Sequence, residues 1–476
     1  MSTPFLNIIY YGKMQLESDL LKVFTTNTIK VFSMLLATFF IPAALSVGEY
    51  STYKLYALIA SYIGLLHFGF NDGVFVEYGG RNLLSLNKNN LANEQTTIIC
   101  LELVLSGIMI TVSLITGNII LLIVSANVIP TILISYYALL YQSTGEFRRY
   151  ANVYNLLSVL SITTNATLVF IIKYDNGLLY ACTEVLVNYI VALFAAFSYN
   201  RKLQLGRGHF RLQILKKYIF IGFLLTIGNV AFVLFGSIDK LFVKILLGSE
   251  EFAYYAFAVQ LLSILNFFVG PIGFTLYNYM CRRKEKEYEY KLKSVITILL
   301  FLLLGVEFLA KSFVDIFFTK YSASISIISI LFLAQVFLLL NTVLYVNLYK
   351  SYKMQRQYFR NLVLAILLST LLNIIICALG YPSSQAFACS TLISTIFWAI
   401  LNLRDFKYLR FKYSHLTFVV ILSITYIFLN IKCGDVISFI IYTAVWAFLF
   451  YYLAHDVLAE LTIHFKMLLA DYKKKK

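Results

Sequence analysis

Several ionisable side chains lie within long apolar stretches of this chain, where a charge is costly to keep. Lys30 follows a run that includes Thr25, Asn27 and Thr28, so the first half of its stretch is polar on several helix faces. An ionised side chain at the centre of a bilayer costs at least about 2.5 kcal/mol, so it needs water, a partner or a substrate. We predict that the three polar residues border a water-filled cavity in which Lys30 binds a passing anion. The alternative is that Lys30 extends its ammonium group to the inner membrane interface.

A second pair of charges closes an apolar stretch near the middle of the chain. Asp239 and Lys240 are adjacent, and neighbouring residues on a helix point about 100° apart, so they do not simply pair with each other. Each therefore needs a partner, water or substrate. We predict that Lys240 is a second cavity cation and that Asn229 borders the cavity. The alternative is a helix end at the outer interface.

Three carboxylic acids also lie within apolar stretches, namely Glu102, Glu184 and Glu307. Carboxylates in such positions relay protons or bind Na⁺ in membrane proteins. The alternative for each is a structural carboxyl group that is held by hydrogen bonds or protonated. All three, together with Asp239, are candidates for ion coupling or for packing between the two halves of the protein.

The composition indicates that membrane-spanning helices hold these residues. Hydrophobic residues make up 60% of the 476-residue chain and charged residues 13%, and the apolar runs are too long for barrel strands and lack their alternation. Most of the 39 Lys and Arg residues fall in alternate gaps between these runs, as cytoplasmic loops require. The net charge of +16 is therefore interpreted as a topology signal, and no nucleic-acid partner is expected.

We predict an all-α membrane protein with about fourteen transmembrane helices, because each span needs about 20 apolar residues. An even number of spans places the N- and C-termini together in the cytoplasm. All gaps on the outer side are short, so any binding must occur within the membrane. The predicted spans are 23–47, 54–70, 95–116, 118–142, 152–173, 177–199, 217–238, 252–278, 294–314, 323–347, 359–379, 383–403, 413–431 and 435–454.

A long basic gap near the middle divides the chain into two pseudo-symmetric lobes. A short repeat supports the division, because EYSTY at 49–53 and EFAYY at 251–255 each open the second helix of a lobe. The lobes would then be parallel copies. The predicted parts are an N-lobe at 1–200, a cytoplasmic loop at 201–216, a C-lobe at 217–403, two additional helices at 404–455 and a cytoplasmic tail at 456–476.

Other features bear on packing and on contact with lipid. Gly69 and Gly73 form a small-xxx-small face for close helix packing. Arg81 follows at the cytoplasmic edge, where it could bind an anionic headgroup or serve only as a topology signal. The stretch 457–469 with Lys473–Lys476 fits an amphipathic helix on anionic lipid, and a solvated tail fits equally well.

The sequence around the seventh and eighth predicted spans resembles a known family. Ser237-Ile238-Asp239-Lys240, then Leu247-Gly248, then Ala253-Tyr254-Tyr255 are similar to the pattern of the polysaccharide-flippase (Wzx-like) branch of the MATE/MOP superfamily. Ala253 stands where that pattern has glycine. The stretches 47–53 and 68–81 are the N-terminal counterparts.

This resemblance implies a MOP-type transporter in the bacterial inner membrane rather than an enzyme. Its substrate would be an undecaprenyl-diphosphate-linked oligosaccharide repeat unit, as in O-antigen or lipopolysaccharide synthesis, flipped to the outer leaflet by alternating access. A polysaccharide polymerase and a chain-length regulator would be its partners, besides membrane lipids. Lys30, Lys240 and Arg81 would bind the diphosphate.

Two other functions remain open. A drug or metabolite:cation antiporter of the same superfamily would use Glu102, Glu184 and Glu307, although Lys30 and Lys240 oppose a cationic substrate. A polysaccharide polymerase or ligase would need a large outer loop, which this sequence lacks. The sequence has no Walker A motif, no dinucleotide fingerprint and no metal-spaced Cys and His residues. We therefore expect no cofactor and no metal, and H⁺ or Na⁺ as possible coupling ions.

Overall fold

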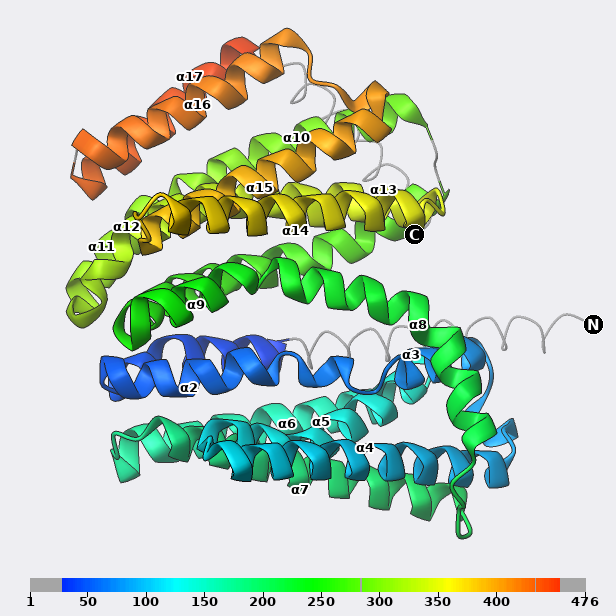
Figure 1. The fold of residues 1–476 in the computed structure, drawn as a ribbon. Helices are drawn as coiled ribbons and strands as arrows, with labels where there is room; N and C mark the ends of the chain where they lie inside the picture. The colour runs from blue at the N-terminus through cyan, green and yellow to red at the C-terminus, as the bar shows by residue number, and fades with distance from the viewer. Residues whose placement is uncertain (1–27, 283–284, 433, 454–476) are drawn as a thin grey trace, which may run out of the picture. The chain divides into compact units, whose positions relative to one another are not determined.

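The computed structural model describes residues 28–282, 285–432 and 434–453, and all regular structure in these residues is helical. The chain divides into two compact units, Met1–Ser237 and Ile238–Lys476. Figure 1 shows the ribbon coloured along the chain.

Unit 1 is an α-helical bundle that begins with the apolar helix Thr28–Ala44. Asparagine and serine side chains start several of its helices by capping free backbone N–H groups: Ser46 caps α2, Asn87 caps α4, Asn118 caps α5 and Asn176 caps α7. The helices are α2 (Val47–Ala60), α3 (Phe70–Tyr78), α4 (Lys88–Thr116), α5 (Ile119–Ser143), α6 (Phe147–Ala166), α7 (Gly177–Leu203) and α8 (Leu212–Phe235), with short helices η1 (Ile63–Leu65), η2 (Leu83–Ser85) and η3 (Thr167–Ile172).

Unit 2 begins with the long helix α9, which is kinked at Gly248 by a left-handed backbone angle (φ 87°). Its helices are α9 (Ile238–Arg282), α10 (Lys286–Leu304), α11 (Val306–Phe317), α12 (Ile325–Leu340), α13 (Val346–Ser351), α14 (Gln355–Ala378), α15 (Ser384–Asp405), α16 (Tyr413–Lys432) and α17 (Asp435–Leu453), with short helices η4 (Thr319–Ser324), η5 (Asn341–Tyr345) and η6 (Lys407–Leu409). Ser383 caps α15 in the same way as the caps of unit 1.

The described helices confirm the all-α, multi-pass membrane architecture. By length and composition, 11 helices are able to cross a membrane, or up to 12 if a bent pair is one span. Every predicted span except 54–70 coincides with a helical segment in the structure, including 23–47, whose described part is Thr28–Ala44, and 252–278 within α9. The tail at 456–476 lies outside the described residues.

The second predicted span, 54–70, is broken rather than continuous. Val47–Leu65 and Phe70–Tyr78 meet at an angle of 51°. Phe68 and Gly69 lie at the break in left-handed conformations, with φ 49° and 98°, which a helix cannot continue through. Apolar length predicted the span here, but hydropathy carries no signal for the backbone break.

The boundary between the two units falls after α8, whereas the predicted C-lobe starts at 217 and therefore includes α8. Tight packing of α8 against α3 places it in unit 1. A Cβ atom on Gly73 would lie 2.1 Å from the Tyr218 carbonyl oxygen, and one on Gly222 would lie 1.9 Å from the Gly69 carbonyl oxygen. Thr226 Oγ1 also donates a hydrogen bond of 2.6 Å to Asp72. The predicted small-xxx-small face at Gly69 and Gly73 is confirmed, with α8 as its partner.

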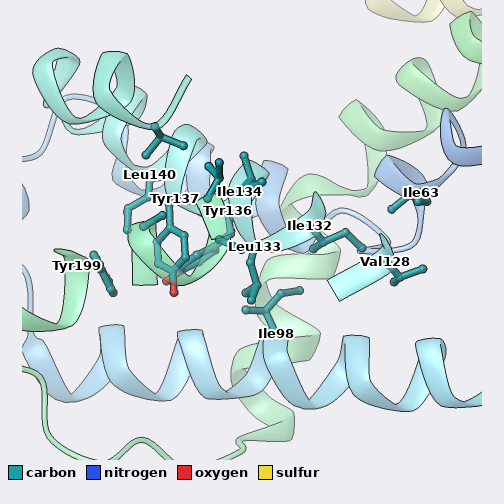
Figure 2. Packing of buried hydrophobic residues seen from close by; sticks show 14 of the residues in the cluster. Ile63, Ile98, Val128, Ile132, Leu133, Ile134, Tyr136, Tyr137, Leu140 and Tyr199 are labelled. Atoms are coloured by element: carbon teal, nitrogen blue, oxygen red, sulfur yellow. The ribbon is translucent and has the colours of Figure 1, made fainter. Parts of the chain in front are cut away.

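Helix α5 carries much of the core of unit 1, as Figure 2 shows. Tyr136 and Tyr137 are fully buried on it, together with Ile132. Tyr199 of α7 packs edge to face on Tyr136, with ring centroids 6.5 Å apart. The Tyr137 hydroxyl accepts a 2.9 Å hydrogen bond from Gln95 Nε2, so its polar end is satisfied within the helix bundle.

Candidate functional site

Unit 1 contains a cavity of about 490 Å³ between four of its helices. Its volume lies in the range of small-molecule sites. The lining residues come from the helix Thr28–Ala44 and from α2, α6 and α7. They are Lys30, Ser33, Met34, Ala37, Tyr53, Tyr154, Leu157, Ser158, Ser161, Thr164, Asn165, Glu184, Val187 and Asn188.

Lys30 supplies the positive charge of this cavity. Its Nζ atom lies 3.4 Å from the centroid of the Tyr154 ring and 5.5 Å from that of Tyr150. The two tyrosine rings are adjacent on α6, with centroids 4.8 Å apart. Among the residues that the structure describes, no carboxylate forms an ion pair with Lys30. Aromatic faces hold the ammonium by cation–π attraction, which leaves its charge available to an anionic ligand.

Glu184 is the carboxyl group of the same cavity and is contributed by α7. Its Oε2 atom accepts a 3.5 Å hydrogen bond from the Tyr53 hydroxyl of α2. One turn away, Asn188 Nδ2 donates to Asn127 Oδ1 at 2.9 Å, and Asn127 Nδ2 donates to the Tyr56 hydroxyl at 2.8 Å. This polar chain links α2, α5 and α7 and fixes the side chains on this wall of the cavity.

The lining residues have the chemistry to bind a polar, ring-containing ligand with a negative charge. Serine, threonine and asparagine side chains donate and accept hydrogen bonds, as sugar hydroxyls require. The tyrosine faces offer apolar surface for a ring, and Lys30 offers a point charge for an anion such as phosphate. Glu184 can accept hydrogen bonds from hydroxyl or amide groups of the ligand.

The internal repeat has a structural counterpart in both units. In unit 1, Glu49 Oε2 accepts a 2.6 Å hydrogen bond from the Gly177 backbone N–H at the start of α7. In unit 2, Glu251 Oε2 accepts a 2.5 Å hydrogen bond from the Ser384 hydroxyl at the start of α15. The acidic residue of each repeat copy thus accepts a hydrogen bond at the start of a later helix of its own unit. These helices, α7 and α15, occupy equivalent places in the two units. This agreement supports the predicted repeat.

The tyrosines of the two copies also correspond, and here the units differ in chemistry. Tyr53 donates to the carboxylate of Glu184 in the cavity wall. Tyr255 instead donates to Asp239 Oδ2 at 2.6 Å, and Thr391 Oγ1 donates to the same oxygen at 2.9 Å. Asp239 is 4% exposed, so its predicted need for partners other than Lys240 is met by these two hydroxyl groups. The two lysines that were predicted to be cavity cations are in different units, because Lys30 is in unit 1 and Lys240 is in unit 2.

We expect Asp239→Ala to destabilise unit 2. The substitution leaves the fully buried Tyr255 hydroxyl without its acceptor, which costs about 1–3 kcal/mol. Thermal unfolding of the purified protein in detergent measures the effect. In a Tyr255→Phe background the same change should cost less, because no buried tyrosine hydroxyl loses its acceptor and Thr391 Oγ1 can still donate to the Phe387 carbonyl oxygen. Equal losses in the two backgrounds would contradict the assignment.

The remaining predicted residues that the structure describes are not among those that line the unit 1 cavity. Arg81 is exposed at the end of α3, with its guanidinium 3.8 Å from Glu77. Glu102 is fully buried on α4, and neither of its carboxyl oxygens has a hydrogen-bond partner. Thr28 and Asn229 are exposed in their units, Glu307 lies in unit 2, and Thr25 and Asn27 are outside the described residues. His67, at the break between α2 and α3, is a buried histidine whose Nδ1 accepts a hydrogen bond from the Gly69 N–H (3.0 Å).

Sequence reasoning missed the α6 wall of the cavity. Ser158, Ser161 and Asn165 recur at spacings of three and four, which places them on one face of a helix. A polar stripe within an apolar span signals a cavity or a partner. Tyr154 begins the same stripe one turn earlier, so the pattern was present in the sequence.

Comparison with solved structures identifies the fold. The lipid II flippase MurJ, in its inward closed conformation, matches the chain with a TM-score of 0.63 at 13% sequence identity, over 90% of this chain and 98% of that chain. The chain therefore shares the fold of this flippase. No protein-family model and no curated protein sequence matches the chain. The fold class expected from the sequence resemblance is therefore confirmed by structure alone.

Proposed function

We propose that this protein flips a lipid-linked oligosaccharide across the bacterial inner membrane. The observation that carries the proposal is the unit 1 cavity, in which a cation held on tyrosine faces lies among hydroxyl and amide groups. A diphosphate headgroup carries negative charge and its sugars carry hydroxyl groups, so the two halves of such a ligand fit the two kinds of lining residue. The MurJ-like fold supports the same reading, since MurJ is described as a lipid II flippase.

The finer proposal is an undecaprenyl-diphosphate-linked repeat unit of a surface polysaccharide such as O-antigen. The resemblance around Asp239 and Lys240 to polysaccharide flippases supports it over the lipid II of MurJ. The repeat unit would move from the cytoplasmic to the outer leaflet by alternating access, driven by an H⁺ or Na⁺ gradient. A polysaccharide polymerase and a chain-length regulator would receive the product.

A cation-coupled drug or metabolite antiporter is the second candidate. Glu184 favours it, because a carboxylate beside the Tyr53 ring in an apolar span suits an organic cation. Lys30 opposes it, because the ammonium lies in the same cavity and repels a cationic ligand. The two functions therefore differ in which of the two charged residues is indispensable.

Gene deletion with lipid analysis tests the proposal. We expect polyprenyl-linked oligosaccharide to accumulate on the cytoplasmic face of the deletion strain and to disappear when the wild-type gene is restored. Protease-free spheroplasts probed with a membrane-impermeant lectin distinguish the two leaflets. Intact surface polysaccharide without any accumulating intermediate would overturn the flippase function. Increased sensitivity to cationic drugs in that strain would then favour the antiporter.

A further inference from the structure

A buried polar cluster in unit 2 joins α11 and α12 to the helices α16 and α17. It contains Glu307 and Lys311 on α11, Ser329 on α12, Asn430 on α16 and Asp435 on α17. Glu307 is fully buried and Lys311 is 6% exposed. These four helices therefore meet around charged groups, within helices that are otherwise long and apolar enough to cross the membrane.

The hydrogen bonds of the cluster leave Glu307 without a cation. Lys311 Nζ is 3.2 Å from Asp435 Oδ1 and donates to Asn430 Oδ1 at 2.8 Å. The Ser329 hydroxyl lies 2.6 Å from Glu307 Oε1 and 3.0 Å from Asn430 Oδ1. Glu307 Oε2 is buried and has no hydrogen-bond partner.

The charges of the cluster do not balance when both acids are ionised. Glu307 and Asp435 are two carboxyl groups, and among the side chains that the structure describes Lys311 is the ammonium group that pairs with one of them. Among the described side chains, Tyr426 on α16 is another titratable group beside Glu307. Its ring packs on Tyr442 of α17 with centroids 6.2 Å apart, and α12 contributes the uncharged Ser329. An unpaired buried carboxylate is strongly disfavoured, so a cation must neutralise Glu307.

The ligand geometry favours a proton over a metal ion. Sodium and other hard cations require several oxygen ligands, but Asn430 Oδ1 is already occupied by Lys311 and Ser329. Among the described residues, no group of three or more His, Cys, Asp or Glu side chains is placed to hold a metal. A proton needs only Glu307 itself and a neighbouring acceptor, which Ser329 provides.

We propose that Glu307 is an exchangeable proton-binding site of unit 2. Protons reach it through Asp435, whose side chain is 18% exposed at the start of α17, and past Lys311, at 8%. When Glu307 loses its proton, two carboxylates share the Lys311 ammonium, and the electrostatic attraction between α11 and α17 is redistributed. The packing of α16 and α17 on the rest of unit 2 thus depends on the protonation of Glu307. The role of this site in transport rests on the proposed function, to which it would supply the ion coupling. Proton binding itself is measurable without transport.

Infrared difference spectroscopy of the full-length protein in lipid nanodiscs tests the site. Between acidic and alkaline buffers we expect a carbonyl stretching band of a protonated carboxyl group that Glu307→Gln abolishes. Ser329→Ala should shift the frequency of this band, because it removes the hydrogen-bond partner of Glu307. Asp315→Asn is the matched control, since Asp315 is an exposed carboxylate on the same helix, and it should leave the band unchanged.

Several outcomes would overturn the proposal. A band that persists in Glu307→Gln, or that does not shift in Ser329→Ala, would assign the proton to another residue. A spectrum that responds to Na⁺ at constant pH but not to pH would replace the proton by Na⁺. If Glu307→Gln does not fold, the frequency shift in Ser329→Ala still tests whether Glu307 carries the proton. Failure of the wild-type protein to flip lipid-linked sugar would refute the proposed function and leave these spectra valid.

Discussion

Lys30→Met is expected to lower lipid-linked oligosaccharide flipping by about tenfold or more while leaving the protein folded. A hydrogen bond to a charged group contributes about 1.5–3 kcal/mol, and each 1.4 kcal/mol corresponds to a factor of about ten. Lys30 is the cation that lines the unit 1 cavity, and no carboxylate among the described residues neutralises it. The substitution therefore removes the charge that would bind a diphosphate.

Methionine keeps an unbranched side chain over the Tyr154 ring and makes favourable sulfur–aromatic contacts, so stability should change little. Lys30→Arg is the matched control, because it retains the charge and stacks on tyrosine. Complementation of the deletion strain, scored by the accumulated lipid-linked sugar, compares the two variants with wild type at equal protein levels. Full activity of Lys30→Met would remove Lys30 from the substrate path. Loss of activity in both variants would indicate a requirement for lysine geometry rather than for charge.

The second large effect concerns the contact of α3 with α8. We expect Gly222→Ala to destabilise unit 1 by about 3 kcal/mol, at the upper end of the range for overpacking. The added Cβ atom would lie 1.9 Å from the Gly69 carbonyl oxygen and 2.5 Å from the Gly73 backbone nitrogen. Backbone atoms cannot rotate away as a side chain can, so the two helices must separate. Separation would also break the hydrogen bond between Thr226 and Asp72.

Gly228→Ala provides the control on the same helix, because a Cβ atom there meets nothing within 4 Å. Alanine favours a helix over glycine by about 1 kcal/mol, so this variant should be as stable as wild type or slightly more stable. Fluorescence-detected size exclusion and thermal unfolding in detergent report both changes. Equal stability of Gly222→Ala and wild type would show that α3 and α8 do not pack as closely as described.

Much of the architecture was predictable from local sequence. Apolar length and the alternation of basic gaps predicted the helices, because burial in lipid requires uninterrupted apolar runs and places Lys and Arg at their ends. The glycine spacing at Gly69 and Gly73 predicted close helix packing, since only the absence of a Cβ atom permits it. Lys30 and Glu184 were identified as candidates because a charge in an apolar stretch is costly.

The sequence by itself determined the class of the protein, its helices and the residues that need partners, because these follow from hydropathy and charge at single positions. Only the tertiary structure decided which partners they have. It brought Lys30 and Glu184 into one cavity with Tyr154, gave Asp239 the hydroxyls of Tyr255 and Thr391, and placed α8 in unit 1. These pairings join helices far apart in the chain, and helix faces are matched by packing shape and hydrogen-bond geometry, for which spacing along the sequence carries no information.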